Sequence, residues 1–255
     1  MGFRTDFQDR PPEVFFTVDV EPDCPPYLHG WRGVTEGLPQ LLDLLAGEKV
    51  PATFFVTGQT AERFPNIVRQ LVAAGHELGC HGYSHGRFGA MDRIQAELEL
   101  AKASSALRRF SPTTAFRAPN LDLPDAFLPL LVEAGFGVDS SEGSHRLDHR
   151  VRRLARTRRE TTGLLRLPAS TTSSVLRLPP GLRDPWLARL ERPVVLLFHP
   201  WELVDLRGER RLRWDCRAGT GPRALAAVRE VIHLFRGCGA RFGTVADWAA
   251  TQTTA

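Results

Sequence analysis

The stretch Glu77-Leu78-Gly79-Cys80-His81-Gly82-Tyr83-Ser84-His85 is a short apolar run that ends in two histidines four residues apart. Two imidazoles at this spacing can converge on one cation, and neutral imidazole is a common protein ligand for zinc. In zinc proteases with the pattern H-E-x-x-H, the residue after the first histidine is a glutamate that serves as the base. Here that position is Gly82, so a third ligand and a base must both come from elsewhere. Taken alone, the stretch is explained equally well by a turn with two surface histidines.

Apolar strand-like runs and helical patterns alternate along the chain on both sides of this stretch. The expected strands are 14–18, 52–56, 77–80, 113–116, a short run ending at Asp139, 164–167, 194–198 and 240–244. The expected helices are 33–46, 60–74, 92–107, 124–134, 221–235 and a short one near Trp248. Strands that alternate with helices at this rhythm indicate βα units and a parallel sheet. The length of 255 residues suits a single α/β barrel domain.

The helix expected over 92–107 carries apolar residues at helical spacing. We expect Asp92 to cap its start. The buried stripe of this helix is expected to consist of Ile94, Leu98, Ala101 and Leu107.

Polar residues follow the ends of five predicted strands: Asp19, His81, Arg117, Asp139 and His199. In a parallel barrel the C-terminal ends of the strands share one face, and catalytic groups collect there. Polar residues with a purely structural role would not be expected to follow this rule five times. The sequence therefore predicts an enzyme whose site lies on that face.

Three carboxylates, Asp19, Glu21 and Asp23, stand at alternate positions beyond the first predicted strand. Carboxylates next to a buried strand are costly unless they bind something. A solvated turn is the alternative, but the apolar run before Asp19 places that residue at the edge of the core.

Composition places few limits on function. Met1–Pro12 is polar and is expected to be a flexible segment without the apolar core of a signal peptide, and no apolar run approaches the ~20 residues that span a bilayer. The four cysteines contain no C-x-x-C pair, which indicates neither a disulfide framework nor a cysteine metal site. These features predict a cytoplasmic protein with reduced cysteines. The net charge of +4 is only a weak indication of anionic partners.

A basic insertion at about 142–162 interrupts the alternation. Its Ser144–His149 segment repeats the four-residue histidine spacing, but flanking arginines oppose metal binding, so we expect an exposed loop. Seven arginines lie between positions 146 and 159; they either form a solvated surface or contact a phosphate on the substrate. The segment Leu176–Arg192 is also rich in leucine and arginine, which allows at most peripheral membrane contact. No nucleic-acid partner is expected, because interleaved aromatic residues and a recognised binding motif are both missing.

Five motifs in this order resemble those of the polysaccharide deacetylases, also called NodB-homology proteins or carbohydrate esterase family 4. They are Thr17-Val18-Asp19-Val20-Glu21, His81-Gly82-Tyr83-Ser84-His85, Arg117-Ala118-Pro119-Asn120, Asp139 and Leu197-Phe198-His199. The resemblance runs from Val14 to about Trp248. It implies a distorted parallel (β/α) barrel of about seven strands, forming one domain over residues 13–250.

The resemblance also implies a role for each polar residue. Asp19 is the implied catalytic base, and Arg117 positions it. His199 is the implied general acid, and Asp139 orients it. The backbone N–H of Asn120 helps to hold the oxyanion.

Glu21, His81 and His85 are the metal ligands that the resemblance implies, for zinc first, with cobalt, nickel, manganese and iron as alternatives. A valine separates the first two carboxylates, whereas the main branch of the family has adjacent aspartates. This spacing resembles a branch that includes some peptidoglycan deacetylases, lipid-linked aminoarabinose deformylases and allantoinase-like amidohydrolases. Members of the last group can lack a metal, and Asp23 is a second candidate ligand.

These residues suit the hydrolysis of an acetyl or formyl amide on an amino sugar. The expected substrate is a lipid-linked, nucleotide-linked or natural-product amino sugar of the cytoplasm. One alternative is a metal-independent, allantoinase-like amidohydrolase for small ureido or cyclic amide substrates; the other is a non-catalytic carbohydrate-binding barrel. Trp201 either stacks on a sugar ring or packs at the rim of the barrel. The oligomeric state stays open.

Overall fold

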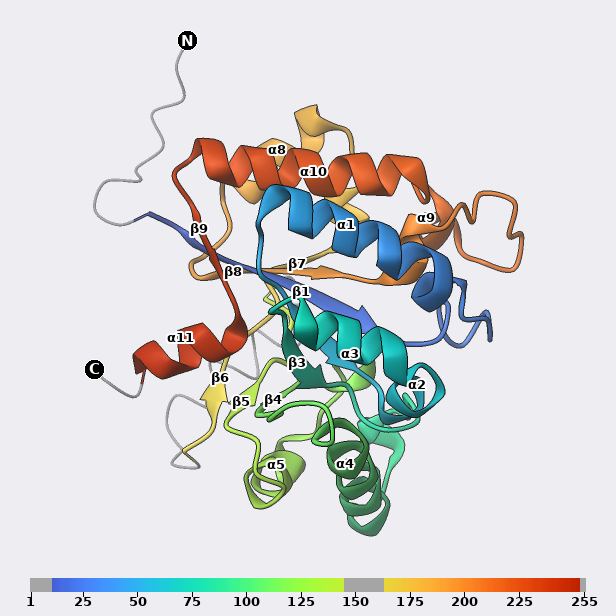
Figure 1. Ribbon diagram of the computed structural model, residues 1–255, viewed down its shortest axis with the longest axis vertical. Helices are drawn as coiled ribbons and strands as arrows, with labels where there is room; N and C mark the ends of the chain where they lie inside the picture. Colours follow the sequence, from blue (N-terminus) through green and yellow to red (C-terminus); the bar gives the residue numbers. More distant parts are fainter. Residues whose placement is uncertain (1–10, 145–162, 253–255) are drawn as a thin grey trace.

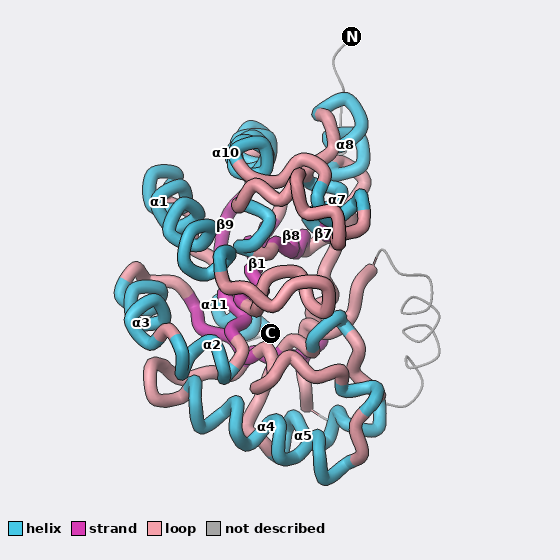
Figure 2. The backbone as a smooth tube through the Cα atoms, turned by 90° about the vertical axis from the view of Figure 1, so that its right-hand side faces the viewer, coloured by secondary structure: helices cyan, strands magenta, loops and turns pink. Residues whose placement is uncertain are grey.

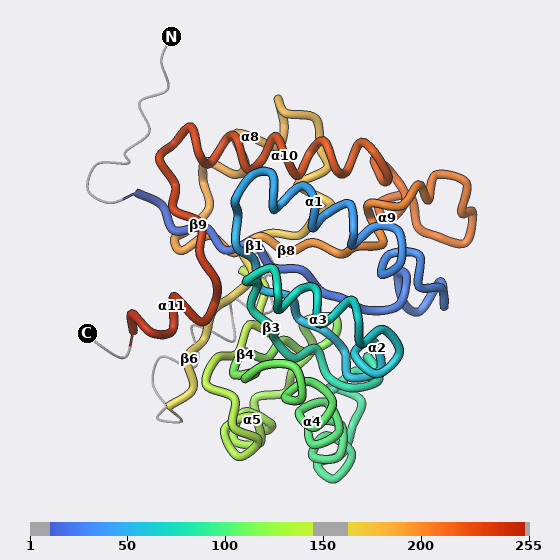
Figure 3. The backbone as a smooth tube through the Cα atoms, in the orientation of Figure 1, coloured from blue at the N-terminus to red at the C-terminus, as the bar shows by residue number. Residues whose placement is uncertain are grey.

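β1 (Glu13–Val20) is the strand around which the other strands gather, and all but its first residue are buried. It pairs in parallel with β2 (Thr53–Val56) on one side and with β8 (Val194–Phe198) on the other. At its start β1 also pairs with β9 (Arg241–Gly243), so the last strand of the chain lies beside the first, as Figure 3 shows. A continuous apolar and β-branched sequence is what a parallel strand with neighbours on both sides requires.

The parallel sheet curls into a distorted barrel in the computed structural model, which describes residues 11–144 and 163–252. The strand order is β6-β5-β4-β3-β2-β1-β8-β7. The strands not yet given are β3 (Glu77–Cys80), β4 (Ala115–Phe116), β5 (Val138–Asp139), β6 (Leu165–Arg166) and β7 (Thr171–Thr172). β6 and β7 belong to one short segment that pairs with β5 at its start and with β8 at its end. The two strands therefore share one place in the circuit, and the predicted parallel barrel of about seven strands is confirmed.

Helices surround the barrel, as Figures 1 and 2 show from two directions. They are α1 (Leu38–Glu48), α2 (Gly58–Arg63), α3 (Pro65–Ala73), α4 (Arg93–Leu107), α5 (Leu128–Glu133), α7 (Ser173–Leu176), α8 (Pro180–Leu187), α9 (Trp214–Arg217), α10 (Pro222–Gly237) and α11 (Val245–Gln252). Single turns are η1 (Gly33–Gly37), η2 (Phe88–Ala90), η3 (Pro119–Leu121), η4 (Asp125–Phe127) and η5 (Pro200–Leu203).

Alternation along β1 sorts its side chains between two layers, because successive residues of a strand point to opposite faces. Val14, Phe16 and Val18 belong to the large apolar cluster that also contains residues of α1, α4 and α10. Phe15 belongs instead to a second, smaller cluster formed with residues of β2, β4, β5 and β8. The residues that share the parity of Phe15, which include Asp19, thus face the interior of the barrel.

Proline sets two helix boundaries differently from the sequence prediction. The helix expected over 60–74 is divided into α2 and α3 at Phe64, which has φ −127° and ψ 55°, because the residue before a proline is disfavoured in the helical region. Pro180 begins α8, an element that was not predicted, and proline suits the first position of a helix. In α8, Leu187 is buried in the main core, whereas Trp186 is exposed.

The predicted buried stripe of α4 was largely wrong. Asp92 caps the helix through a capping box, as predicted, but Ile94 and Leu98 are 68% and 55% exposed. The buried face consists of Ala96, Glu99, Leu100, Ala103, Ser104, Ala106 and Leu107. Small residues on this face let α4 approach α2 closely, since a Cβ added at Gly58 would lie 3.3 Å from the Cα of Ala103. The buried face therefore combines four small residues with Glu99, Leu100 and Leu107.

We expect Leu100→Ala to lower the free energy of unfolding by about 2–5 kcal/mol, because it leaves a cavity in the core. Ile94→Ala on the same helix should change this free energy by no more than about 0.5 kcal/mol. Urea unfolding of the two variants measures both values, and a larger loss for Ile94→Ala than for Leu100→Ala would contradict the observed helix orientation.

Candidate active site

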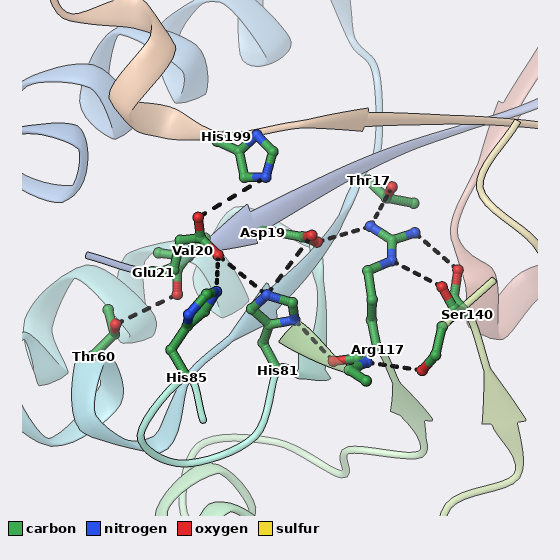
Figure 4. Close-up of polar contacts among 12 residues, drawn as sticks. Thr17, Asp19, Val20, Glu21, Thr60, His81, His85, Arg117, Ser140 and His199 are labelled. Carbon is green, nitrogen blue, oxygen red and sulfur yellow. Dashed lines mark hydrogen bonds and ion pairs between the residues drawn. The ribbon is translucent and has the colours of Figure 1, made fainter. Parts of the chain in front are cut away.

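The C-terminal ends of β1, β3 and β8 bring five polar residues together, as Figure 4 shows. Asp19 lies near the end of β1, and Glu21 directly follows that strand. His81 directly follows β3, His85 lies in the loop beyond it, and His199 directly follows β8. The structure thus brings residues from distant parts of the sequence together at the C-terminal ends of the strands, which is the face on which the sequence predicted the site.

Glu21, His81 and His85 form a group whose three ligand atoms lie within 4.8 Å of one another. Glu21 Oε2 is 2.6 Å from His85 Nε2 and 3.2 Å from His81 Nε2. His81 Nδ1 is 2.8 Å from the carbonyl oxygen of Arg117. Because a carbonyl only accepts hydrogen bonds, Nδ1 carries the proton, which leaves Nε2 of the neutral ring free to bind a cation. One carboxylate and two imidazoles with converging atoms fit a divalent metal such as zinc.

The charge of Glu21 is balanced by the surrounding imidazoles. Burial alone would raise the pKa of Glu21, but the charges of His85 and His199 and the hydrogen bonds from His81 and His85 outweigh it. The pKa of Glu21 therefore lies well below its usual value. For His85 the signs are reversed. Burial lowers the pKa of His85, but the charge of Glu21 and its hydrogen bond outweigh burial and raise this pKa above its usual value. A buried anion of this kind needs positive charge beside it, from protons or from a cation.

Glu99 of α4 fixes the loop that carries both histidines. Its Oε1 accepts from the backbone N–H of Tyr83 at 2.9 Å, from the N–H of Ser84 at 2.6 Å and from the Ser84 hydroxyl at 2.8 Å. The loop needs this support because His85 has a left-handed backbone angle, with φ of 62°, and this region is unfavourable for a residue with a Cβ. Gly82, with φ of 72°, adopts the same region without a steric cost. Sequence reasoning missed Glu99; the signal was an acidic residue on the face of α4 that packs against the barrel.

We expect Glu99→Ala to weaken zinc binding by about 10- to 100-fold, because groups that orient metal ligands contribute effects of this size. Isothermal titration of chelator-treated protein with zinc measures the affinity. Glu97→Ala is the matched control, since Glu97 lies on the same helix and pairs only at the surface with Arg93. Equal zinc affinity in the two variants would show that the loop holds its shape without Glu99.

Arg117 connects the carboxylate of Asp19 to the floor of the site. Its guanidinium is fully buried and lies over the ring of Phe55, with Cζ 4.2 Å from the ring centroid. Nη1 donates to Asp19 Oδ1 and to Thr17 Oγ1, both at 2.8 Å, and Nη2 donates to Ser140 Oγ at 2.9 Å. Asp19 Oδ2 faces His81 Nε2 at 3.8 Å. Arg117 therefore holds one oxygen of Asp19 and turns the other toward the metal-ligand group.

His199 contacts a carboxylate other than the predicted one. Its Nδ1 lies 2.9 Å from Glu202 Oε1, and its Nε2 lies 3.9 Å from Glu21 Oε1. The predicted partner, Asp139, instead lies 2.7 Å from Arg166 Nε and accepts from Ser141. The predicted contact between Asp139 and His199 was therefore wrong, because Asp139 is held by Arg166 on the neighbouring β6, whereas Glu202 follows His199 in the same turn.

Two residues near Glu21 have structural contacts that the sequence did not decide. Asp23 accepts from the backbone N–H of Gly33 at 2.7 Å and from that of Arg32 at 2.9 Å, so both of its oxygens support the turn η1. Trp201 is 6% exposed and stacks on His199 with ring centroids 5.0 Å apart, while its Nε1 donates to Glu21 Oε1 at 3.3 Å. Of the two alternatives for Trp201, the structure shows packing.

Three further predictions stay predictions. Asn120 is exposed and has a left-handed backbone with φ 59°, and its role at the oxyanion is a hypothesis. His145, His149 and the arginine-rich part of the insertion at 146–159 lie outside the described residues. Within the described ranges, no helix is both long and apolar enough to cross a bilayer.

We expect Glu21→Gln to abolish zinc binding and Asp23→Asn to leave it intact, because only Glu21 has its oxygens among the imidazoles. Asp23→Asn should instead lower the melting temperature, since it weakens two hydrogen bonds to the backbone of η1. Metal analysis and thermal unfolding of the two variants test the distinction. Loss of zinc from Asp23→Asn together with retention in Glu21→Gln would identify Asp23 as the ligand.

Comparison with known proteins agrees with the geometry of the site. The profile of the polysaccharide deacetylase family matches residues 8–138, just over half of the sequence, and the chain belongs to this family. A chitooligosaccharide deacetylase from Sinorhizobium fredii is 39% identical over 79 residues, which are 31% of this chain and 37% of the relative. A peptidoglycan-N-acetylglucosamine deacetylase from Bacillus cereus is 34% identical over 99 residues, which are 39% of this chain and 32% of the relative. The matched regions thus span about a third of each relative.

The fold also matches a crystal structure from Mycobacterium smegmatis. The TM-score is 0.65 at 22% sequence identity, and the alignment covers 96% of this chain and 91% of the other. At this identity the match defines the fold alone. The similarity of fold continues beyond residue 138, where the family profile ends, and includes the part of the barrel that carries His199.

Proposed function

We propose that the protein is a metal-dependent hydrolase that removes the acetyl group from an N-acetylated amino sugar. The observation that carries the proposal is the buried group of Glu21, His81 and His85 beside a carboxylate and a third histidine. A metal site with a separate acid and base is what hydrolysis of an unactivated amide requires. The names of the two relatives, which specify chitooligosaccharide and peptidoglycan N-acetylglucosamine, support an amino sugar as the substrate.

Glu21, His81 and His85 would hold the cation. When bound, a divalent cation lowers the pKa of water and polarises the acyl oxygen. Asp19 takes the proton of the attacking water through Oδ2, the oxygen that faces the ligand group. Arg117 keeps Asp19 in place through Oδ1.

His199 donates a proton to the nitrogen of the departing amine. Burial lowers the pKa of His199, but the hydrogen bond to Glu202 and the charge of Glu21 raise it to about 9. The ring is therefore protonated at neutral pH before the reaction, as a general acid must be. The water contributes the new C–O bond, the C–N bond breaks, and the products are acetate and the free amino sugar.

The proposed substrate can be an oligosaccharide or another derivative of an amino sugar, and assays with each form distinguish them. Oligosaccharides of N-acetylglucosamine are the first substrates to test, and the lipid-linked, nucleotide-linked and natural-product sugars expected from the sequence come next. N-formyl sugars test the choice of acyl group. Allantoin tests the alternative of an allantoinase-like amidohydrolase.

We expect Asp19→Asn to lower kcat for release of acetate from N-acetyl chitooligosaccharides by about 10²- to 10⁴-fold, because it removes the general base. The asparagine retains an oxygen that can accept from Arg117, so the variant should keep its fold and its bound zinc. Enzymatic detection of acetate, with metal content measured on the same samples, checks both statements. A fully active Asp19→Asn variant would exclude Asp19 as the base.

A further inference from the structure

Glu202 is a buried carboxylate directly behind the histidine of the site. It is 2% exposed, and Oε1 lies 2.9 Å from His199 Nδ1. Ser173, at the start of α7, donates its hydroxyl to the same oxygen. Arg177, at the end of α7, places Nε 3.5 Å from Oε2. These residues place a hydroxyl group and a guanidinium beside the buried carboxylate, and so compensate for the hydration that it loses.

Backbone hydrogen bonds also hold Glu202 in place. His199 and Glu202 stand at the beginning and within the single turn η5, where Glu202 N donates to His199 O at 3.1 Å. The carbonyl of Glu202 accepts from Gly221 N at 2.8 Å, immediately before α10 begins. Ser173, Glu202 and Gly221 therefore join three segments of the chain beside the Nδ1 edge of the His199 ring. A face of this ring stacks on Trp201.

We propose that Glu202 is the positioning residue of His199, in the place that the sequence assigned to Asp139. The inference rests on the proposed deacetylase function. Glu202 accepts the Nδ1 proton, which turns Nε2 of the same ring toward Glu21 and the reacting amide. The carboxylate also stabilises the positive charge of the ring before the proton leaves, as the aspartate of a serine-protease triad does.

Residues of this chain supply and accept the protons that move while the amide bond is cleaved. Nε2 gives its proton to the amine nitrogen while the C–N bond breaks, and the water proton goes to Asp19. The Nδ1 proton stays on the ring throughout, in its hydrogen bond with Glu202. Asp139 is not available for this role, because it lies between Arg166 and Ser141 at the end of β5.

Glu202→Gln tests the proposal, because it removes the charge while keeping the shape of the side chain. On N-acetyl chitooligosaccharides we expect kcat to fall by about 10- to 100-fold, with KM unchanged. On an aryl acetate ester the rate should be nearly unchanged, because a phenolate leaves without a proton from His199. In Glu202→Asp, which restores the charge, part of the lost kcat on the amide should return. The double variant His199→Ala/Glu202→Gln should be no slower than His199→Ala, because Glu202 acts through the histidine.

Glu77→Gln is the matched control, because Glu77 is a half-buried glutamate at the start of β3, the end of the strand away from the site, where it accepts from Thr53 and from the backbone of Ala246. It should leave both activities unchanged. Equal losses on the amide and the ester in Glu202→Gln, or losses that multiply in the double variant, would reduce Glu202 to a structural role and overturn the proposal.

A spectroscopic measurement keeps the inference separate from the proposed function. In the wild-type protein, proton NMR should show a slowly exchanging, downfield Nδ1 proton for His199, which disappears in both His199→Ala and Glu202→Gln. If the zinc-loaded wild type releases no acetate, the proposed function fails, whereas this signal still tests the contact. If the wild type lacks the signal, or Glu202→Gln retains it, Glu202 does not hold the ring.

Discussion

The buried carboxylate of Glu21 is the constraint on which the site depends. Its oxygens lie within hydrogen-bonding distance of two imidazoles and within 3.9 Å of a third, and an ionised carboxylate in such a place requires positive charge around it. Glu21 follows β1, two of the imidazoles follow β3 and the third follows β8, so the compensation exists only in the folded barrel. A cation in the same place would satisfy the carboxylate and be bound by the neutral rings of His81 and His85, because neutral imidazole is the form in which histidine binds a metal.

Every second residue of β1 points into the barrel, so these side chains follow one another from the start of the strand to the site at its end. Phe15 lies in the apolar cluster at the start of the strand, Thr17 and Asp19 bind the guanidinium of Arg117, and Glu21 meets the histidines. Each of these residues is two positions beyond the last, so all project into the barrel. The ring of Phe55 packs against the guanidinium of Arg117, which binds the carboxylate of Asp19. The carbonyl of Arg117 fixes the tautomer of His81, so one residue positions both the proposed base and a proposed metal ligand.

Much of this arrangement could be predicted from the sequence, because it follows from local patterns. Buried parallel strands are continuous apolar runs, and the polar residue after each run marks the face that carries the site. The partners of those residues were less predictable. Asp139 and Glu202 are both acidic residues near strand ends, and only the three-dimensional contacts with Arg166 and His199 tell them apart. Glu99 was hidden for the same reason, since its acceptors are backbone groups of a loop fifteen or sixteen positions earlier in the chain. The error in α4 arose because its packed face includes four small residues, whereas the large apolar residues Ile94 and Leu98 are exposed.

The dependence of activity on metal stoichiometry is the most direct measurement of the central claim. Protein treated with a chelator would receive zinc in steps below one equivalent, while acetate release from N-acetyl chitooligosaccharides is followed. The site of one carboxylate and two imidazoles predicts background activity without metal, followed by a linear rise that ends at one zinc per chain. Full activity in protein shown by elemental analysis to contain no divalent metal would contradict the account and favour metal-independent hydrolysis on the same barrel.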